Sequence, residues 1–303
     1  MEQIIRVIAA SALLTTALIF QVKADVVLAG PDSNDGSYST AALSAAANPG
    51  DTKTAEGVTG ISLWGFLGGA TPASGSPGVY GAITTVPGGS NPKNTILRYY
   101  LVATGASGVQ SVVSMGEIDP TFGNGPSVNA FVAFQTSGGT QLATPSLIVP
   151  GQPGRDVTNL KSLQILSVPA ISGAGGVSTA VQLSGNVAAP GSYNLAKPQT
   201  FTPAQLTVGS DTYTGVPLWA FLNTTAASSL NQIVTTQATD GYEVVVALAE
   251  LDPVLGGNPN DLLPYADTAN TFPAAAARWA SRERSIRPTR RMGVGSRTWI
   301  SSR

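Results

Sequence analysis

The sequence repeats itself, and this repeat constrains the fold more than any other feature. At an offset of 155 residues, 14 of the 42 residues from Val26 to Leu67 recur identically between Val181 and Leu222. A second block, 108–123, matches 241–256 at an offset of 133, so the first copy carries 22 additional residues. Solenoid units run about 20–50 residues, so copies of this length are expected to be whole domains.

The two copies set the expected domain organisation. We expect a first domain at 26–168 and a second at 177–273, joined by the glycine-rich segment 172–176, which is flexible by composition. The additional residues of the first copy are placed at 71–94, where proline, glycine, serine and asparagine indicate an inserted loop or hairpin.

Each copy is predicted to be an α+β domain in which strands dominate. Short strands open the copies at 26–28 and 181–183. The Leu-Trp-x-Phe-Leu pattern at 63–67 and 218–222 is typical of one or two helical turns packed on a sheet. Further strands are expected at 109–115, 147–150, 163–166 and 242–248.

The absence of two residue types excludes most catalytic chemistry. The 303 residues include no cysteine and no histidine, so the chain has no disulfide, no thiolate nucleophile, no Ser-His-Asp triad and no thiolate or imidazole metal ligand. Charged residues make up 11% of the chain, against about 25% in an average globular protein. We therefore expect a core-forming chain with a neutral surface, and we identify no catalytic residue and no metal ligand.

The first 24 residues are expected to be a secretory signal peptide. Arg6 precedes an uncharged run of 14 residues from Val7 to Phe20, and the small-residue pattern Val22-Lys23-Ala24 predicts cleavage before Asp25. The run is shorter than the ~20 residues that span a bilayer. We expect an exported protein, periplasmic or extracellular, with no transmembrane span in the mature chain.

The opposite end is rich in arginine. Residues 274–303 contain eight of the 16 basic side chains, whereas residues 25–273 contain 15 acidic and 6 basic side chains, a net charge of −9. One interpretation is an arm that binds nucleic acid or an anionic surface. The interpretation that we favour is an aberrant end, so we expect no nucleic-acid partner; the sequence identifies no other partner.

Several residues are candidates for a site, and each has a structural alternative. The carboxylate pairs Glu117/Asp119 and Glu250/Asp252 suit acid–base or Ca²⁺ chemistry, but Asp-Pro commonly starts a turn or caps a helix, which we favour. Trp64 and Trp219 suit sugar stacking, but their apolar stripe favours core packing. The other candidates are Tyr38 and Tyr193 as turn or strand anchors and Asn223 as the acceptor of a glycosylation sequon.

Several motifs in order resemble the oxidoreductase molybdopterin-binding domain of the sulfite-oxidase type. The second copy shows Gly215 to Leu222, Asp240-Gly241-Tyr242, Ala249 to Pro253 and Leu262 to Tyr265. The first copy adds Ile148 to Gly151 and Gly154 to Leu160, the Gly-Arg-x-Val-x-Asn-Leu element that closes the family's domain. The resemblance implies a mixed α/β fold repeated twice, with the second copy incomplete.

The resemblance also implies a pterin cofactor, which this chain departs from. In that family a cysteine holds molybdenum while His and Arg side chains grip the cofactor, and this chain has neither Cys nor His. Arg155 is the only residue that we transfer, as a phosphate contact; the alternative is a solvated loop arginine beside an aspartate. We expect no cofactor, with molybdopterin as the group that the resemblance allows.

The same motif offers an explanation of the arginine-rich end. Read from the third base of the Met292 codon, the degenerate codons of residues 292–300 permit Gly-Arg-Trp-Val-Ser-Asn-Leu-Asp. We hypothesise that a frameshift replaced the last strands of the second domain with residues 274–303. That domain would then have an unpaired sheet edge and an exposed apolar patch, and lower stability than the first.

Three classes of function remain. The first is an exported binding or structural protein without the metal-ligating cysteine. The second is a periplasmic molybdopterin-dependent oxidoreductase, and the third is a surface or adhesive protein, which the neutral exterior would suit.

Overall fold

The computed structural model describes residues 25–30, 36–47, 49–67, 95–120, 122, 126–175, 180–187, 190–194, 201–208, 211–222, 229–267 and 299–302. Strands dominate and helices are short, so the chain is a β-rich α+β protein, as predicted. The expected signal peptide 1–24, the insert 71–94 and Asn223 lie outside the described residues.

The first half contains two sheets. The first is formed, in spatial order, by β2 (Gly36–Tyr38), β1 (Val26–Ala29), β9 (Leu160–Ser167), β5 (Tyr99–Gly105) and β6 (Gln110–Ser114). The second is formed by β3 (Thr52–Ala55), β4 (Val58–Ser62), β7 (Phe131–Thr136) and β8 (Gln141–Ile148). All neighbours are antiparallel except β1 and β9, which run parallel.

The second half repeats this arrangement. Its first sheet is formed by β11 (Gly191–Asn194), β10 (Ala180–Gly185), β17 (Trp299–Ser302), β14 (Ile233–Gln237) and β15 (Glu243–Ala247). Its second is formed by β12 (Ala204–Val208), β13 (Asp211–Pro217) and β16 (Leu262–Asp267). The parallel pair recurs between β10 and β17.

The structure corrects one expectation about the end of the chain. The second half was expected to lack its closing strands, but β17 lies between β10 and β14 as β9 lies between β1 and β5. The physical reason is that a sheet ladder uses backbone N–H and C=O groups, which any sequence without proline supplies. For the other sheet the described residues supply no counterpart of β8, so β16 pairs with β13 alone.

Short helices sit where capping residues follow a strand. Ser62 ends β4 and its Oγ accepts a hydrogen bond from Gly65 N (2.9 Å), which starts α2 (Leu63–Phe66). Ser39 caps α1 (Thr40–Ala46) in the same way. The equivalent of α2 in the second half is α4 (Leu218–Leu222), which follows Pro217. Both helices lie at the predicted Leu-Trp-x-Phe-Leu pattern.

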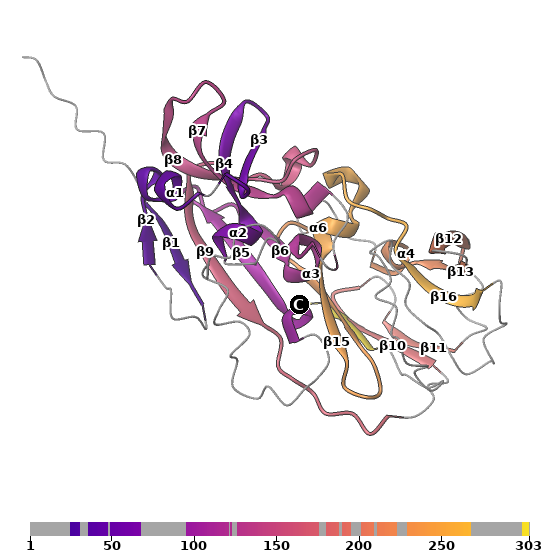
Figure 1. Ribbon diagram of the computed structural model, residues 1–303. Helices are drawn as coiled ribbons and strands as arrows, with labels where there is room; N and C mark the ends of the chain where they lie inside the picture. The colour runs from indigo at the N-terminus through magenta and orange to yellow at the C-terminus, as the bar shows by residue number, and fades with distance from the viewer. Residues whose placement is uncertain are drawn as a thin grey trace, which may run out of the picture.

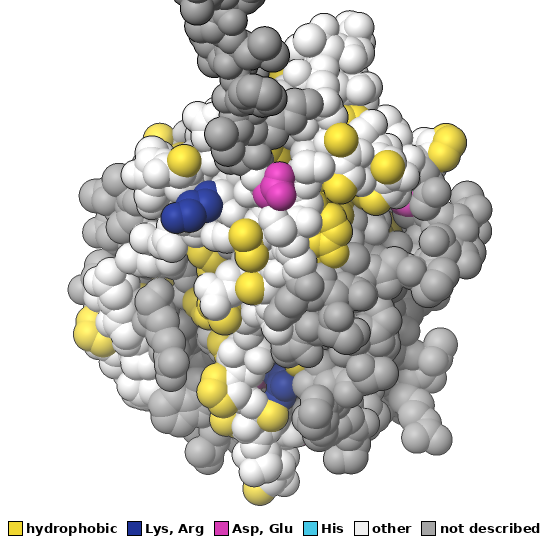
Figure 2. Space-filling model, turned by 90° about the vertical axis from the view of Figure 1, so that its left-hand side faces the viewer, with side chains coloured by type: hydrophobic (Ala, Val, Ile, Leu, Met, Phe, Trp, Pro, Cys, Tyr) yellow, Lys and Arg dark blue, Asp and Glu magenta, His cyan; other side chains and the backbone are white. Residues whose placement is uncertain are grey.

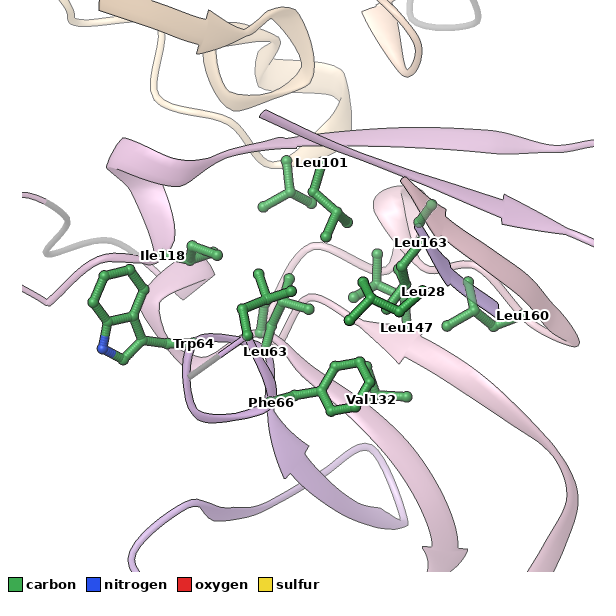
Figure 3. Packing of buried hydrophobic residues seen from close by; sticks show 14 of the residues in the cluster. Leu28, Leu63, Trp64, Phe66, Leu101, Ile118, Val132, Leu147, Leu160 and Leu163 are labelled. Atoms are coloured by element: carbon green, nitrogen blue, oxygen red, sulfur yellow. The ribbon is translucent and has the colours of Figure 1, made fainter. Parts of the chain in front are cut away.

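The apolar face of α2 is buried in the core of the first half. Figure 3 shows Leu63 and Phe66 pointing toward Val132 and Leu147, with Trp64 beside Ile118. The structural alternatives for the aromatic candidates are confirmed: Trp64 is 7% exposed, and the Tyr38 ring packs edge-on against Phe66 with centroids 5.2 Å apart. Tyr193 makes the same contact with Phe221 at 5.5 Å, and Trp219 packs against the second core.

The two halves meet through equivalent elements. In Figure 1, β15 lies beside β6 and β5, and the loops that follow β6 and β15 lie close together. Val112 N in β6 donates to Leu230 O (2.7 Å) of the second half. A hydrophobic cluster spans the boundary and consists of Val112, Val168, Ile233, Val245 and Ala247. We call this boundary the junction.

The glycine-rich segment between the halves is held by hydrogen bonding and packing. Gly175 N donates to Thr239 O (2.9 Å), and a Cβ on Gly173 would collide with the backbone at Thr239. The expectation of a flexible joint, which rested on composition alone, is therefore wrong for residues 172–175.

Candidate functional site

Arg155 lies at the centre of a buried polar cluster beside the junction. It ends η4 (Pro153–Arg155), a 3₁₀ turn, and its side chain is fully buried. Nη2 donates to Glu117 Oε1 (2.8 Å) and to Val112 O (3.0 Å). Nη1 donates to Glu117 Oε2 (3.0 Å), Gln152 Oε1 (2.8 Å) and Ser127 Oγ (3.2 Å). The guanidinium thus bridges a bidentate carboxylate and the edge strand β6.

Local hydrogen bonds fix the loop that carries Arg155. Gln152 N donates to Val149 O (2.9 Å), and Arg155 N donates to Gln152 O (2.8 Å), which winds the chain into η4. Pro153 stands in the first turn, where its missing N–H costs nothing. Val157 then pairs with Leu147, so the loop 149–157 folds back on the end of β8.

Glu117 is held by the helix that follows β6. It occupies the third position of α3 (Met115–Ile118), where it forms a capping box with Ser114. Ser114 N donates to Glu117 Oε1 (2.8 Å), and Glu117 N donates to Ser114 Oγ (3.2 Å). With 3% of its side chain exposed, the carboxylate has exchanged water for these bonds and for Arg155.

The second half contributes polar groups to the same region. Glu250, in α6 (Leu248–Leu251), is the counterpart of Glu117, and its Oε2 accepts a hydrogen bond from Ser114 Oγ (3.2 Å) across the junction. Gln152 Nε2 donates to Gly256 O (2.8 Å). These two bonds tie the Arg155 cluster to the second half.

The carboxylate pairs have the structural roles that the sequence favoured. Asp252 caps η6 (Pro253–Leu255), with Oδ1 accepting from Val254 N (2.9 Å), so its position before proline is used as expected. Its other oxygen, Oδ2, is buried with no hydrogen-bond partner within the described ranges. Glu117 is a cap and an ion-pair partner, and neither pair forms an acid–base dyad.

The charge state of Arg155 is secured by its neighbours. Burial alone would lower the pKa of Arg155, but the attraction and hydrogen bonds of Glu117, with a smaller contribution from Glu250, raise it above its ordinary value. The guanidinium therefore stays protonated, and one arginine balances carboxylates from both halves.

A second buried carboxylate lies at the far end of the same strand pair. Burial raises the pKa of Glu243, a rise that a hydrogen bond from Gln237 Nε2 (2.7 Å) and the charge of Arg98 oppose. Because Arg98 belongs to the first half and Glu243 to the second, this contact also crosses the junction.

The residues in place do not fit a molybdenum–pterin group. The chain contains no thiolate, and within the described ranges no three Asp and Glu side chains gather as a metal site would require. Both Nη atoms of Arg155 already donate to protein acceptors, so the phosphate contact expected from the resemblance has no free terminal nitrogen. The alternative, a solvated loop arginine, is wrong, because the side chain is 0% exposed.

No protein-family model matches this sequence, and no curated protein is significantly similar to it. Within the part of the chain that the structure describes, no helix is both long and apolar enough to cross a membrane. On the face shown in Figure 2, the charged side chains of the described residues stand apart from one another and the hydrophobic ones are scattered.

Sequence reasoning missed the partners of Arg155. Gln152 and Ser127 carried no motif, and Glu117 lies 38 residues from Arg155 in the chain. The available signal was the repeat, because Glu117 and Glu250 recur in register within otherwise apolar strands and helices. A repeated carboxylate in an apolar setting indicates a buried partner of opposite charge.

Proposed function

We propose that this protein is an exported binding or structural protein, built from two copies of a fold resembling the molybdopterin-binding domain of the sulfite-oxidase type. In this proposal the protein performs no metal redox chemistry of its own. Residues 1–24 would direct export, and the mature chain would act outside the cytoplasm.

The observation that carries the proposal is the state of Arg155. The one residue transferable from the family as a cofactor contact is fully buried and directs both Nη atoms to Glu117, Gln152, Ser127 and Val112 O. An arginine that gripped a phosphate would need these donors free at a solvent-reached surface. The proposal assigns Arg155 a positioning role, in which it fixes β6 and α3 at the junction.

The test is metal analysis and cofactor extraction on the full chain. We expect neither molybdenum nor pterin to accompany the protein in a constant molar ratio through successive purification steps. Stoichiometric molybdenum or pterin would overturn the proposal and establish the alternative, a periplasmic molybdopterin-dependent oxidoreductase.

A further inference from the structure

A glutamate occupies a backbone conformation that favours glycine. Glu56 and Gly57 form the two-residue turn between β3 and β4, with φ of 53° and 78°. Such turns prefer Asn-Gly or Asp-Gly, because a longer side chain at the first position is strained in the left-handed region. A glutamate kept there points to a contact made by its carboxyl group.

That contact reaches the loop that carries Arg155. Glu56 Oε1 accepts a hydrogen bond from Gly151 N (3.3 Å), 95 residues away in the chain. The same carboxyl group lies within hydrogen-bonding reach of the Asp156 side chain. Asp156 Oδ1 in turn accepts from Val149 N (2.8 Å), so both carboxyl groups are anchored to one loop.

Two carboxyl groups at this distance attract only when a proton lies between them. An ionised carboxylate has acceptors and no donor, so one of the two must be protonated for a hydrogen bond to form. We propose that Glu56 and Asp156 share one proton and so form a proton-dependent clasp that holds the loop 149–157 to the β3–β4 turn.

The neighbouring charges leave the pair to itself. Arg155 directs its guanidinium to Glu117, Lys53 Nζ donates to Asn129, and Lys161 is exposed on β9. The end of β8 offers Asp156 only the uncharged Val149 N–H. Glu56 is therefore the charged group that acts on Asp156.

The direction of the pH dependence follows. Burial raises the pKa of Asp156 from near 4 to about 7, and the Glu56 carboxyl group adds to the rise. A carboxyl group with a raised folded-state pKa lowers stability as the pH climbs from its unfolded pKa to its folded pKa. The clasp is thus closed near pH 5 and loses its proton around pH 7. Because the loop also carries Gln152 and Arg155, opening the clasp loosens the junction as well.

The experiment uses the full chain and two variants that need no shared proton. In D156N the amide can donate to Glu56 while its oxygen still accepts from Val149 N, and in E56Q the amide can donate to Asp156. We expect the melting temperature of each variant to match that of the wild type near pH 4. The variants should exceed it by a few degrees at pH 8, with the step around pH 6–7. The control D240N alters a carboxylate that also accepts a backbone N–H, from Tyr242 (3.0 Å), and should show no such step.

A direct titration makes the test independent of variant folding. The carbon-13 shift of the Asp156 carboxyl group in the wild-type protein is followed from pH 3 to pH 9 by NMR, and we expect its midpoint near pH 7. A midpoint below about pH 5, or a variant–wild-type difference that does not change with pH, would overturn the clasp. The outcome is independent of the metal analysis, so the two proposals fail separately.

Discussion

Replacement of Arg155 by methionine tests the buried cluster most severely. The substitution keeps most of the side-chain volume and removes all five hydrogen bonds of the guanidinium. The carboxylate of Glu117 would then keep only the hydrogen bond from Ser114 N, with 3% of its side chain exposed. Removing one partner of a buried pair costs about 3–5 kcal/mol, so R155M should lower the free energy of unfolding by that amount.

Urea unfolding followed by tryptophan fluorescence measures this loss. The E117Q variant should also be destabilised, although glutamine still fits the capping box at that position. The double variant R155M/E117Q leaves neither charge unpaired, so its loss should be smaller than the sum of the single losses by more than about 1 kcal/mol. The exposed Lys161 provides the control, since K161M should stay within about 0.5 kcal/mol of the wild type. If R155M is destabilised by less than about 1 kcal/mol, or the two losses simply add, the buried pair is not what holds this region.

Three further expectations concern the backbone and the chain ends. A Cβ on Gly60 would collide with Val132 O and Ala133 Cα of the neighbouring strand, so G60A should cost about 3 kcal/mol or more by thermal unfolding. Gly50 has open space around it, and G50A should be nearly neutral by the same assay. Deletion of residues 299–303 removes the strand between β10 and β14, and the second half should then lose hydrogen-exchange protection while the first half keeps it; uniform loss would contradict this. Amino-terminal sequencing of the protein from the culture supernatant or periplasm should begin at Asp25, and an uncleaved Met1 would contradict the predicted export signal.

Much of the fold could be predicted because local patterns and the repeat agree. The strands expected at 109–115 and 242–248 are β6 and β15, and the turns expected at 63–67 and 218–222 are α2 and α4. In each case apolar residues at the right spacing bury a continuous face, and the second copy repeats the pattern. Asp252 before Pro253 was likewise predictable as a cap, because the capping geometry is local.

The parts that could not be predicted depend on contacts distant in sequence. Arg155 beside Asp156 has the local pattern of a solvated loop, and only the fold reveals that Glu117 faces it. The strand β17 escaped prediction because arginine-rich sequence carries no strand pattern, and its place in the sheet is set by the backbone groups that β10 and β14 leave open. The turn at Glu56 was also hidden, since its contact with Gly151 spans 95 residues.

The parallel pairing of β1 with β9 has a consequence for the order of folding. Val27 and Ser162 are neighbours in the sheet but 135 residues apart in the chain, and Gln182 and Trp299 repeat this separation in the second half at 117 residues. Loops of this length close slowly, and proteins dominated by such contacts have high contact order and fold in milliseconds to seconds. The hairpins β5–β6 and β14–β15, joined by short turns, should therefore form early, with the parallel ladders completed last. Until then the edges of β1 and β10 stay open, and chaperone contact or self-association would compete for them in this interval.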